Sequence, residues 1–247
     1  MAMDPAIKNI QIYGERCSGT NYLQLLLQQN LESVRVRPTF GWKHFFHKEG
    51  VEAADDYLFV IIYRNPFDWL RSINKKPHHA APELRKNDFS DFIRKEWWCI
   101  WDEQAKKRAE KEGYGTEMMF ERDPETGERF ANVVRLRAAK IRNWESLRDK
   151  TKNNMYVRYE DLAANPEAFI NTLSERFGIA RTPTFTNIKG FKGRSEQFRP
   201  KTYQPIKADD MQHILRELDV QLEQRIGYNV EELAAELGAA VPIVSSG

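Results

Sequence analysis

The sequence predicts an α/β fold of three layers, in which helices flank a central parallel sheet. Three segments rich in apolar, β-branched and aromatic residues are expected as strands: 9–13 ("NIQIY"), 57–63 ("YLFVIIY") and 155–159 within "NNMYVRYEDL". The middle segment is apolar throughout, which is typical of a strand buried on both faces of a parallel sheet. A helical pattern follows each of them, and strands that alternate with helices form parallel sheets.

The expected helices have recognisable starts and faces. Segment 20–31, "TNYLQLLLQQNL", carries leucines at helical spacing. Pro66 in "NPFDWLRSI" and Pro166 after the third strand suit the first turn of a helix, where proline is well tolerated. An amphipathic helix is expected over 133–147 and a late helix within "MQHILRELDVQLEQRIGY". The opening loop, residues 14–19, therefore lies on a strand-to-helix turn.

The middle of the chain is less regular. A long helix is expected over "FSDFIRKEWWCIWDEQAKKRAEK", followed by a hairpin around Asp123 to Gly127. Trp97 and Trp101 would share one face of that helix, and core packing explains the tryptophans, Trp98 included, more simply than sugar stacking does. Arg135, Arg137 and Lys140 are expected on a solvated helix face.

Composition excludes several classes of protein. The 247 residues hold 38 Lys and Arg against 36 Asp and Glu, a net charge of +2 that indicates neither nucleic-acid binding nor a polybasic membrane surface. Two cysteines argue against a disulfide scaffold. Without a signal core or a run of about 18 apolar residues, a soluble, cytoplasmic protein is expected. We expect one domain over 1–247, with 1–6 and 239–247 as flexible tails.

The segment "YGERCSGTNYL" has the outline of a phosphate-binding loop. Gly14 and Gly19 have the separation of the glycines in Gly-x-x-x-x-Gly-Lys-Ser/Thr, but Thr20 and Asn21 replace the lysine and the magnesium-binding hydroxyl residue. The spacing predicts an anion cradle without the groups that hold magnesium-ATP. Arg16, Ser18, Thr20 and the amides of residues 17–21 could hold an oxyanion directly. The alternative is that the glycines only make a tight turn.

A second candidate anion site follows the second strand. In "YRNPFDWLRS", Arg64 leaves the strand and Ser72 lies eight residues on, about two helical turns later. Both side chains are expected to reach one phosphate at the start of a helix. Two separate phosphate sites are what a bisphosphorylated nucleotide requires.

With these motifs the sequence resembles the family of sulfotransferases that use 3'-phosphoadenosine 5'-phosphosulfate (PAPS). "CSGTN" stands where the family has a loop like Lys-Ser-Gly-Thr-Thr, and "RNPFDWLRS" matches Arg-Asn-Pro-x-Asp-x-x-x-Ser, the 3'-phosphate motif, at every fixed position. "YEDL" resembles the strand end at which Tyr159 would lie against the adenine. "KGFKGR" resembles the late segment in which Lys192, Gly193 and Arg194 would close over the 3'-phosphate.

The resemblance implies a P-loop NTPase-like sulfotransferase fold and in-line transfer of the sulfuryl group from PAPS to a hydroxyl or amine, without a metal. PAP, adenosine 3',5'-bisphosphate, would be the product. The acceptor would be a small molecule, a carbohydrate or another hydroxyl or amine compound, and the oligomeric state is left open. The residues implied to hold the phosphosulfate are Arg16, Cys17, Ser18, Gly19, Thr20 and Asn21.

The chain departs from the family at Cys17, where most members have a lysine or arginine that stabilises the leaving group. Either Arg16 supplies this charge, or Lys43 in "GWKHFF" does. His44 is the expected base for the acceptor proton, with His47, Glu15 and Asp68 in reserve. His78 and His79 fit a polar loop better than a metal site, because no cysteine or carboxylate stands at ligand spacing.

Two other functions remain as alternatives. A P-loop kinase would require magnesium-ATP, against which Thr20 in the lysine position weighs. A catalytically inactive nucleotide-binding or interaction module on the same fold is suggested by Cys17 in the position of the cation.

Overall fold

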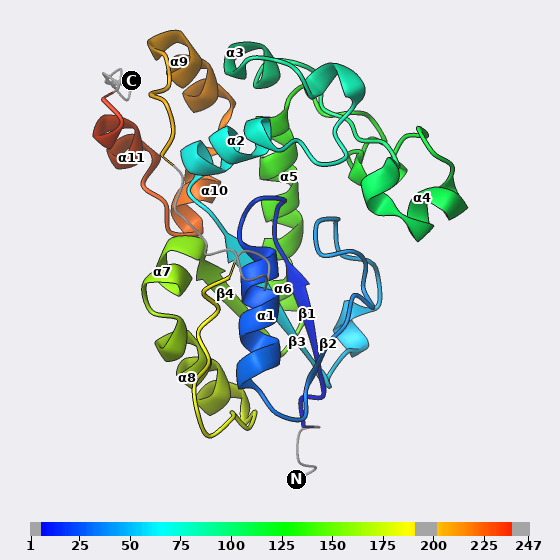
Figure 1. The fold of residues 1–247 in the computed structure, drawn as a ribbon, viewed down its shortest axis with the longest axis vertical. Helices are drawn as coiled ribbons and strands as arrows, with labels where there is room; N and C mark the ends of the chain where they lie inside the picture. The colour runs from blue at the N-terminus through cyan, green and yellow to red at the C-terminus, as the bar shows by residue number, and fades with distance from the viewer. Residues whose placement is uncertain (1–5, 191–201, 239–247) are drawn as a thin grey trace. The chain divides into compact units, whose positions relative to one another are not determined.

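The computed structural model describes residues 6–190 and 202–238 (Figure 1). Internal contacts divide the chain into two compact units, each built from two stretches of sequence. The first unit comprises Met1–Asn65 and Arg142–Lys201, and the second comprises Pro66–Ile141 and Thr202–Gly247. The candidate cradle loop lies in the first unit.

A four-stranded parallel sheet forms the centre of the first unit. Its order is β2 (Arg35–Val36), β1 (Asn9–Tyr13), β3 (Tyr57–Tyr63) and β4 (Asn154–Arg158). Every neighbouring pair is parallel, and Ile61 of β3 lies between Tyr13 and Tyr156. The α/β class with helices flanking a parallel sheet is thus confirmed. Strand β4 begins and ends one residue before the predicted strand, and the two-residue β2 was not predicted.

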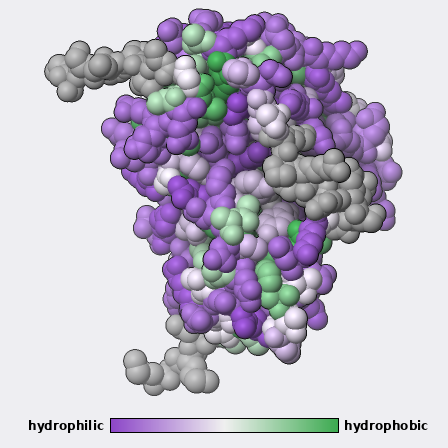
Figure 2. Space-filling view, turned by 60° about the vertical axis from the view of Figure 1, so that its left-hand side comes forward, coloured by the Kyte–Doolittle hydropathy of each residue, from purple (hydrophilic) through white to green (hydrophobic). Residues whose placement is uncertain are grey.

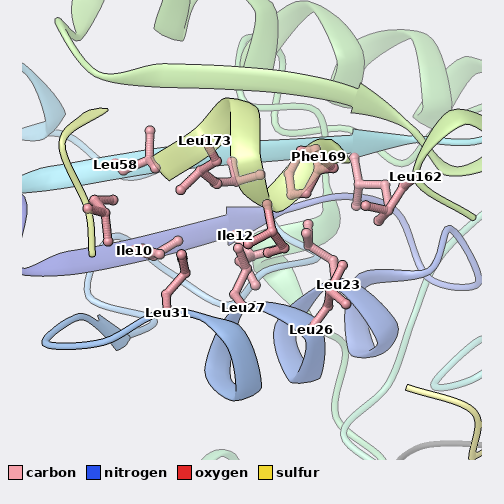
Figure 3. Close-up of a cluster of buried hydrophobic side chains, with 14 residues drawn as sticks. Ile10, Ile12, Leu23, Leu26, Leu27, Leu31, Leu58, Leu162, Phe169 and Leu173 are labelled. Carbon is pink, nitrogen blue, oxygen red and sulfur yellow. The ribbon is translucent and has the colours of Figure 1, made fainter. Parts of the chain in front are cut away.

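One face of this sheet packs against α1 (Thr20–Asn30), α7 (Tyr159–Ala164) and α8 (Pro166–Phe177). Figure 3 shows side chains of these helices converging on those of β1 and β3. The members of the core cluster labelled there are Ile10, Ile12, Leu23, Leu26, Leu27, Leu31, Leu58, Leu162, Phe169 and Leu173. The leucines that predicted α1 are therefore its buried face, and their burial holds the helix start beside the end of β1.

The opposite face of the sheet is aromatic. Tyr13 stacks on Phe59 and on Trp144, with ring centroids 6.5 and 6.2 Å apart. The hydroxyl of Tyr63 donates to Glu145 Oε1 at 2.9 Å, and burial holds the pKa of Tyr63 well above its ordinary value. The 3₁₀ turn η1 (Val51–Ala53) and α6 (Leu147–Lys150) contact one another in this unit.

The second unit is helical. Its elements are α2 (Pro66–Lys75), η2 (Pro82–Leu84), α3 (Phe89–Phe92), η3 (Glu103–Ala105), α4 (Lys107–Glu112), η4 (Met119–Glu121), α5 (Val133–Glu145, whose last turn belongs to the first unit), α9 (Ala208–Glu217), α10 (Val220–Arg225) and α11 (Val230–Glu236). Helix α5 confirms the helix predicted over 133–147. The late helix is divided in two, because the Asp219 side chain accepts a hydrogen bond from the amide of Leu222 and starts α10 there.

The long helix predicted over the tryptophan-rich segment is wrong. Helix α3 ends at Phe92, and Trp97, Cys99 and Ile100 instead form isolated antiparallel bridges with Phe130, Ala80 and Glu117. Aromatic and β-branched residues fit extended backbone well, so pairing with distant segments overrides the local helical pattern. Trp97 and Trp101 are buried as predicted, but not on a shared helix face. The core prediction is wrong for Trp98, which is only partly buried because its indole N–H donates to Glu83 Oε1 and its ring packs under the Arg129 guanidinium.

The hairpin predicted around Asp123 to Gly127 is present only as a turn. In this turn the Asp123 amide donates to the Glu128 carbonyl, and the Gly127 amide donates to the Asp123 carbonyl. The element before the turn is the 3₁₀ turn η4 and not a strand.

Of the three cations predicted on a solvated face of α5, only Arg135 is exposed. Arg137 and Lys140 are buried, and they form ion pairs with Glu223 and Glu121. A buried charge is stable only when it is paired, so these contacts with distant carboxylates explain why cations face the interior.

A surface ion-pair cluster in the second unit predicts a pH-dependent stability. Hydrogen bonds from Arg122 and Arg129 lower the pKa of Glu117 from 4.5 to about 2. Because the pKa is lower in the folded chain, this stabilisation is complete above about pH 4.5 and is lost as the pH falls towards about 2. We expect the difference in unfolding free energy between wild type and Glu117→Gln to shrink between about pH 7 and about pH 3, measured by urea titration.

Exposed Glu125 provides the control for this prediction, since Glu125→Gln removes the same charge without touching the two arginines. An equal difference for Glu117→Gln at both pH values would contradict the assignment.

Candidate functional site

The candidate site is built on the loop between β1 and α1. The amide of Gly14 donates to the Lys43 carbonyl at 3.0 Å, and the Ser18 amide and hydroxyl both donate to the Glu15 carbonyl at 3.2 and 2.6 Å. These bonds fold the loop into a compact turn. Gly19 occupies the N-cap of α1 and offers no side-chain cap, so the helix start presents backbone amides and its positive dipole end, which favour an anion.

Both glycines are required by close contacts. A Cβ on Gly14 would lie 2.7 Å from the Ile62 carbonyl oxygen, and one on Gly19 would lie 2.4 Å from Cδ2 of Tyr159. Gly19 also has a φ of 95°, which a side chain disfavours. The spacing that suggested a cradle therefore marks two positions where only glycine fits.

Arg64 and Tyr159 meet this loop in the first unit. Arg64 Nη1 donates to the Cys17 carbonyl at 2.8 Å, and its guanidinium lies 5.2 Å from the centroid of the Tyr159 ring. The same ring packs against Gly19. Three motifs recognised separately in the sequence thus converge on one end of the sheet, as expected where parallel strands end and helices begin.

Cys17 adopts a φ of 66°, which is uncommon for a residue other than glycine. This conformation turns its carbonyl oxygen to Arg64. Its side chain is only partly buried and lies at the loop that leads into α1. The main-chain contact means that Cys17 contributes to the site whatever its side chain does.

His44 and Lys43 lie beside the same loop. The Gly14 carbonyl can only accept, so His44 Nδ1 donates to it at 2.7 Å. The ring also meets Trp42 edge to face, at 4.6 Å between centroids. Lys43 Nζ donates to Asn21 Oδ1 at 2.6 Å and to Gln24 Oε1 at 3.0 Å. Both residues predicted from "GWKHFF" therefore contact the cradle.

Arg16, the other predicted cation, is buried, with its guanidinium 5.4 Å from the centroid of the Trp42 ring. Ser18 and Thr20 are buried in the loop and the first turn of α1. Neither Trp42 nor Gln24 was singled out from the sequence. Both stand in segments without a phosphate-binding pattern, and only tertiary contacts reveal them.

The reserve candidates for a base are placed differently. His47 donates through Nδ1 to the Lys48 carbonyl at 3.0 Å, and burial lowers its pKa. Glu15 is buried in the loop. Asp68 belongs to the second unit and forms an ion pair with Arg71 at 2.5 Å.

The other four predicted cofactor-binding residues belong to the second unit or to the part of the chain that is not described. Ser72 is a buried residue of α2 in the second unit, so its joint site with Arg64 stays a prediction. Lys192, Gly193 and Arg194 lie outside the described residues.

The second unit contains a polar cluster that the sequence did not reveal. His79 Nδ1 lies 2.7 Å from Asp102 Oδ1, and Arg85 binds the other oxygen of that carboxylate at 2.9 Å. His79 is buried, so the prediction of a polar loop fits only His78, which contacts Gln104. Asp102 stands at no recognisable spacing from His79. Within residues 6–190 and 202–238, no group of three or more His, Cys, Asp or Glu side chains is arranged to hold a metal ion.

Neither the apolar character of the helices nor the hydropathy of the surface marks a second candidate site in the described residues. No helix in the described part of the chain combines the length and apolar character needed to cross a membrane. Hydrophilic residues dominate the face shown in Figure 2, where hydrophobic residues form small separate groups.

No protein-family model matches the chain, and no curated protein matches it significantly. The geometry and chemistry of the cradle are therefore the basis for assigning a function.

Proposed function

We propose that this protein is a PAPS-dependent sulfotransferase with a P-loop NTPase-like sulfotransferase fold. The observation that carries the proposal is the meeting of Arg64, Tyr159 and the loop of Cys17 and Gly19 at the start of α1. Such a site offers backbone amides and a cation that can bind an anion, together with an aromatic ring on which an adenine can stack. These are the groups that a nucleotide phosphosulfate needs.

In the proposed reaction, an acceptor oxygen or nitrogen attacks sulfur in line with the bond to the 5'-phosphate. That bond breaks, its electron pair stays on the phosphate oxygen of PAP, and the acceptor proton passes to the base. His44 is suited to this role because Gly14 holds it in the tautomer whose Nε2 can accept a proton. Arg16 or Lys43 supplies positive charge for the leaving phosphate.

The donor is PAPS rather than magnesium-ATP because the cradle lacks the lysine and hydroxyl that hold a metal nucleotide. The resemblance of the sequence motifs assigns Ser72, Lys192, Gly193 and Arg194 to binding of the 3'-phosphate. A hydroxyl or amine of a small molecule or carbohydrate is the proposed acceptor. Radiolabelled PAPS with a panel of phenols, alcohols, amines and oligosaccharides would identify it.

Thermal unfolding with PAP or magnesium-ATP tests the proposed donor site. PAP at about a hundred times its Kd is expected to stabilise the protein by about 2.7 kcal/mol, and magnesium-ATP at the same concentration much less. Arg64→Ala should abolish the PAP effect, because the variant loses the cation beside the loop. Exposed Arg37 provides the matched control, and Arg37→Ala should respond as wild type does.

Stabilisation by magnesium-ATP in place of PAP would support a kinase and contradict the proposal. Binding of PAP without any sulfuryl transfer would indicate an inactive nucleotide-binding module.

A further inference from the structure

A carboxylate of the "YEDL" segment bonds the main chain beside Arg64. Glu160 follows Tyr159 in α7, and its Oε1 accepts a hydrogen bond from the Asn65 amide at 3.0 Å. Asn65 follows Arg64 directly in the chain. A residue 95 positions after Asn65 therefore holds the backbone next to Arg64.

This contact extends the link between two strands beyond their last paired residues. Strands β3 and β4 are parallel, and Tyr63 at the end of β3 is the partner of Arg158 at the end of β4. The bond between Glu160 and Asn65 lies two residues past this pair on both strands. A side-chain carboxylate thus fixes the exit of β3 at the point where the ladder between the strands ends.

The same two segments also meet through the Arg64 side chain. Its guanidinium lies 5.2 Å from the centroid of the Tyr159 ring, and its Nη1 donates to the Cys17 carbonyl. Pro66 restricts the backbone of the residue before it. Arg64 is therefore held at its main chain as well as at its guanidinium. A side chain that is ordered before binding loses less entropy when a ligand arrives.

A carboxylate at this place also has a cost. Like charges repel, so Glu160, one residue from Tyr159, opposes the binding of an anion at the loop. A charged acceptor nevertheless makes a stronger hydrogen bond to an amide than a neutral one does. Fixing the backbone beside Arg64 is a role that explains a carboxylate next to an anion site.

We propose that Glu160 is a positioning residue that orients Arg64, and that through Arg64 it sets the preference for a nucleotide with a 3'-phosphate. This inference rests on the proposed function, which assigns Arg64 to the 3'-phosphate. Adenosine 5'-monophosphate (AMP) differs from PAP only by lacking that phosphate. The ratio of the two affinities therefore measures how well the 3'-phosphate is held.

Titration calorimetry of PAP and AMP tests the positioning role. Glu160→Ala should raise the Kd for PAP about tenfold, because the backbone of Arg64 is no longer fixed. The Kd for AMP should change by less than about twofold, since AMP has no 3'-phosphate for Arg64 to bind. A carboxylate that only stabilised the fold would affect both nucleotides equally.

Two variants provide the controls. Glu160→Gln keeps an oxygen that accepts from the Asn65 amide, and it should restore the Kd for PAP to within about threefold of wild type. Asp161→Ala removes the next carboxylate of α7, which pairs with Arg158 at 2.7 Å, and both affinities should equal those of wild type. Urea unfolding would show that each variant is folded.

Arg64→Lys shows whether Glu160 acts through Arg64. Lysine keeps the charge but not the planar fork of arginine, so this variant should itself weaken PAP binding. Combined with Glu160→Ala, it should weaken binding by less than the product of the two separate effects, because both changes disturb one interaction. Effects that multiply would overturn the positioning role.

The outcomes separate this inference from the proposed function. Equal changes for PAP and AMP in Glu160→Ala, including none, would overturn the inference alone. A Glu160→Gln variant as weak as Glu160→Ala would do the same. Wild-type protein that fails to bind PAP, or binds it no more tightly than AMP, would overturn the proposed function and this inference with it.

Discussion

Gly19→Ala is expected to weaken PAP binding about 100-fold or more, a loss of about 2.7 kcal/mol. The new Cβ would lie 2.4 Å from Cδ2 of Tyr159, so the ring must leave the start of α1. The substitution also places a side chain on backbone with a φ of 95°. Titration of PAP by calorimetry measures the loss.

Gly50→Ala separates the effect of the collision with Tyr159 from the effect of the positive φ. Gly50 has a φ of 85°, but a Cβ there would meet no atom within 4 Å. It therefore carries the backbone cost without the collision, and its affinity for PAP should equal that of wild type. If Gly19→Ala retained wild-type affinity, the cradle would not be the nucleotide site.

Glu223→Ala is expected to destabilise the second unit by about 3–5 kcal/mol, because it leaves a buried arginine without its carboxylate. Arg137 and Glu223 are 0% and 2% exposed, and their two hydrogen bonds measure 2.5 and 2.8 Å. The Arg137 guanidinium also lies 5.1 Å from the Trp69 ring, a contact that cannot replace a negative charge. Thermal and urea unfolding would measure the loss, which corresponds to a fall of roughly 10 °C in Tm.

Two further variants test whether the unpaired buried charge causes this destabilisation. Glu96→Ala removes the more exposed partner of Arg129 and should cost less than about 1 kcal/mol. The double variant Arg137→Met and Glu223→Leu removes both buried charges and should recover most of the stability. A double variant as unstable as Glu223→Ala would show that shape, not charge, limits this position.

Local patterns predicted the parts of the fold that depend on nearby residues. Strand β3 follows from a continuous apolar run, β1 from a short run rich in β-branched and aromatic residues, and α1 from leucines at helical spacing. The predictions failed where a distant partner decides the structure. Trp97 pairs with Phe130 and not with the next helical turn, and Arg137 faces Glu223, 86 residues later.

In the candidate site, too, local sequence patterns predicted some residues, whereas contacts between distant residues were found only in the structure. A short sequence pattern located Gly14, Gly19 and Arg64, because anion-binding loops need glycine and a cation at set positions along the chain. It did not predict the contact of Tyr159 with Gly19, nor reveal His79 beside Asp102. Such pairs depend on how separate elements pack, and spacing carries no signal for them.

By itself, the sequence determined that this protein has a parallel α/β sheet and a glycine-containing loop that lacks the lysine and hydroxyl residue of a magnesium-ATP loop. Only the tertiary structure showed that Lys43 contacts the helix that follows this loop. Lys43 reaches Asn21 from 22 residues along the chain. It does so because the segment after β2 folds back to bond Gly14, and no local propensity encodes that return.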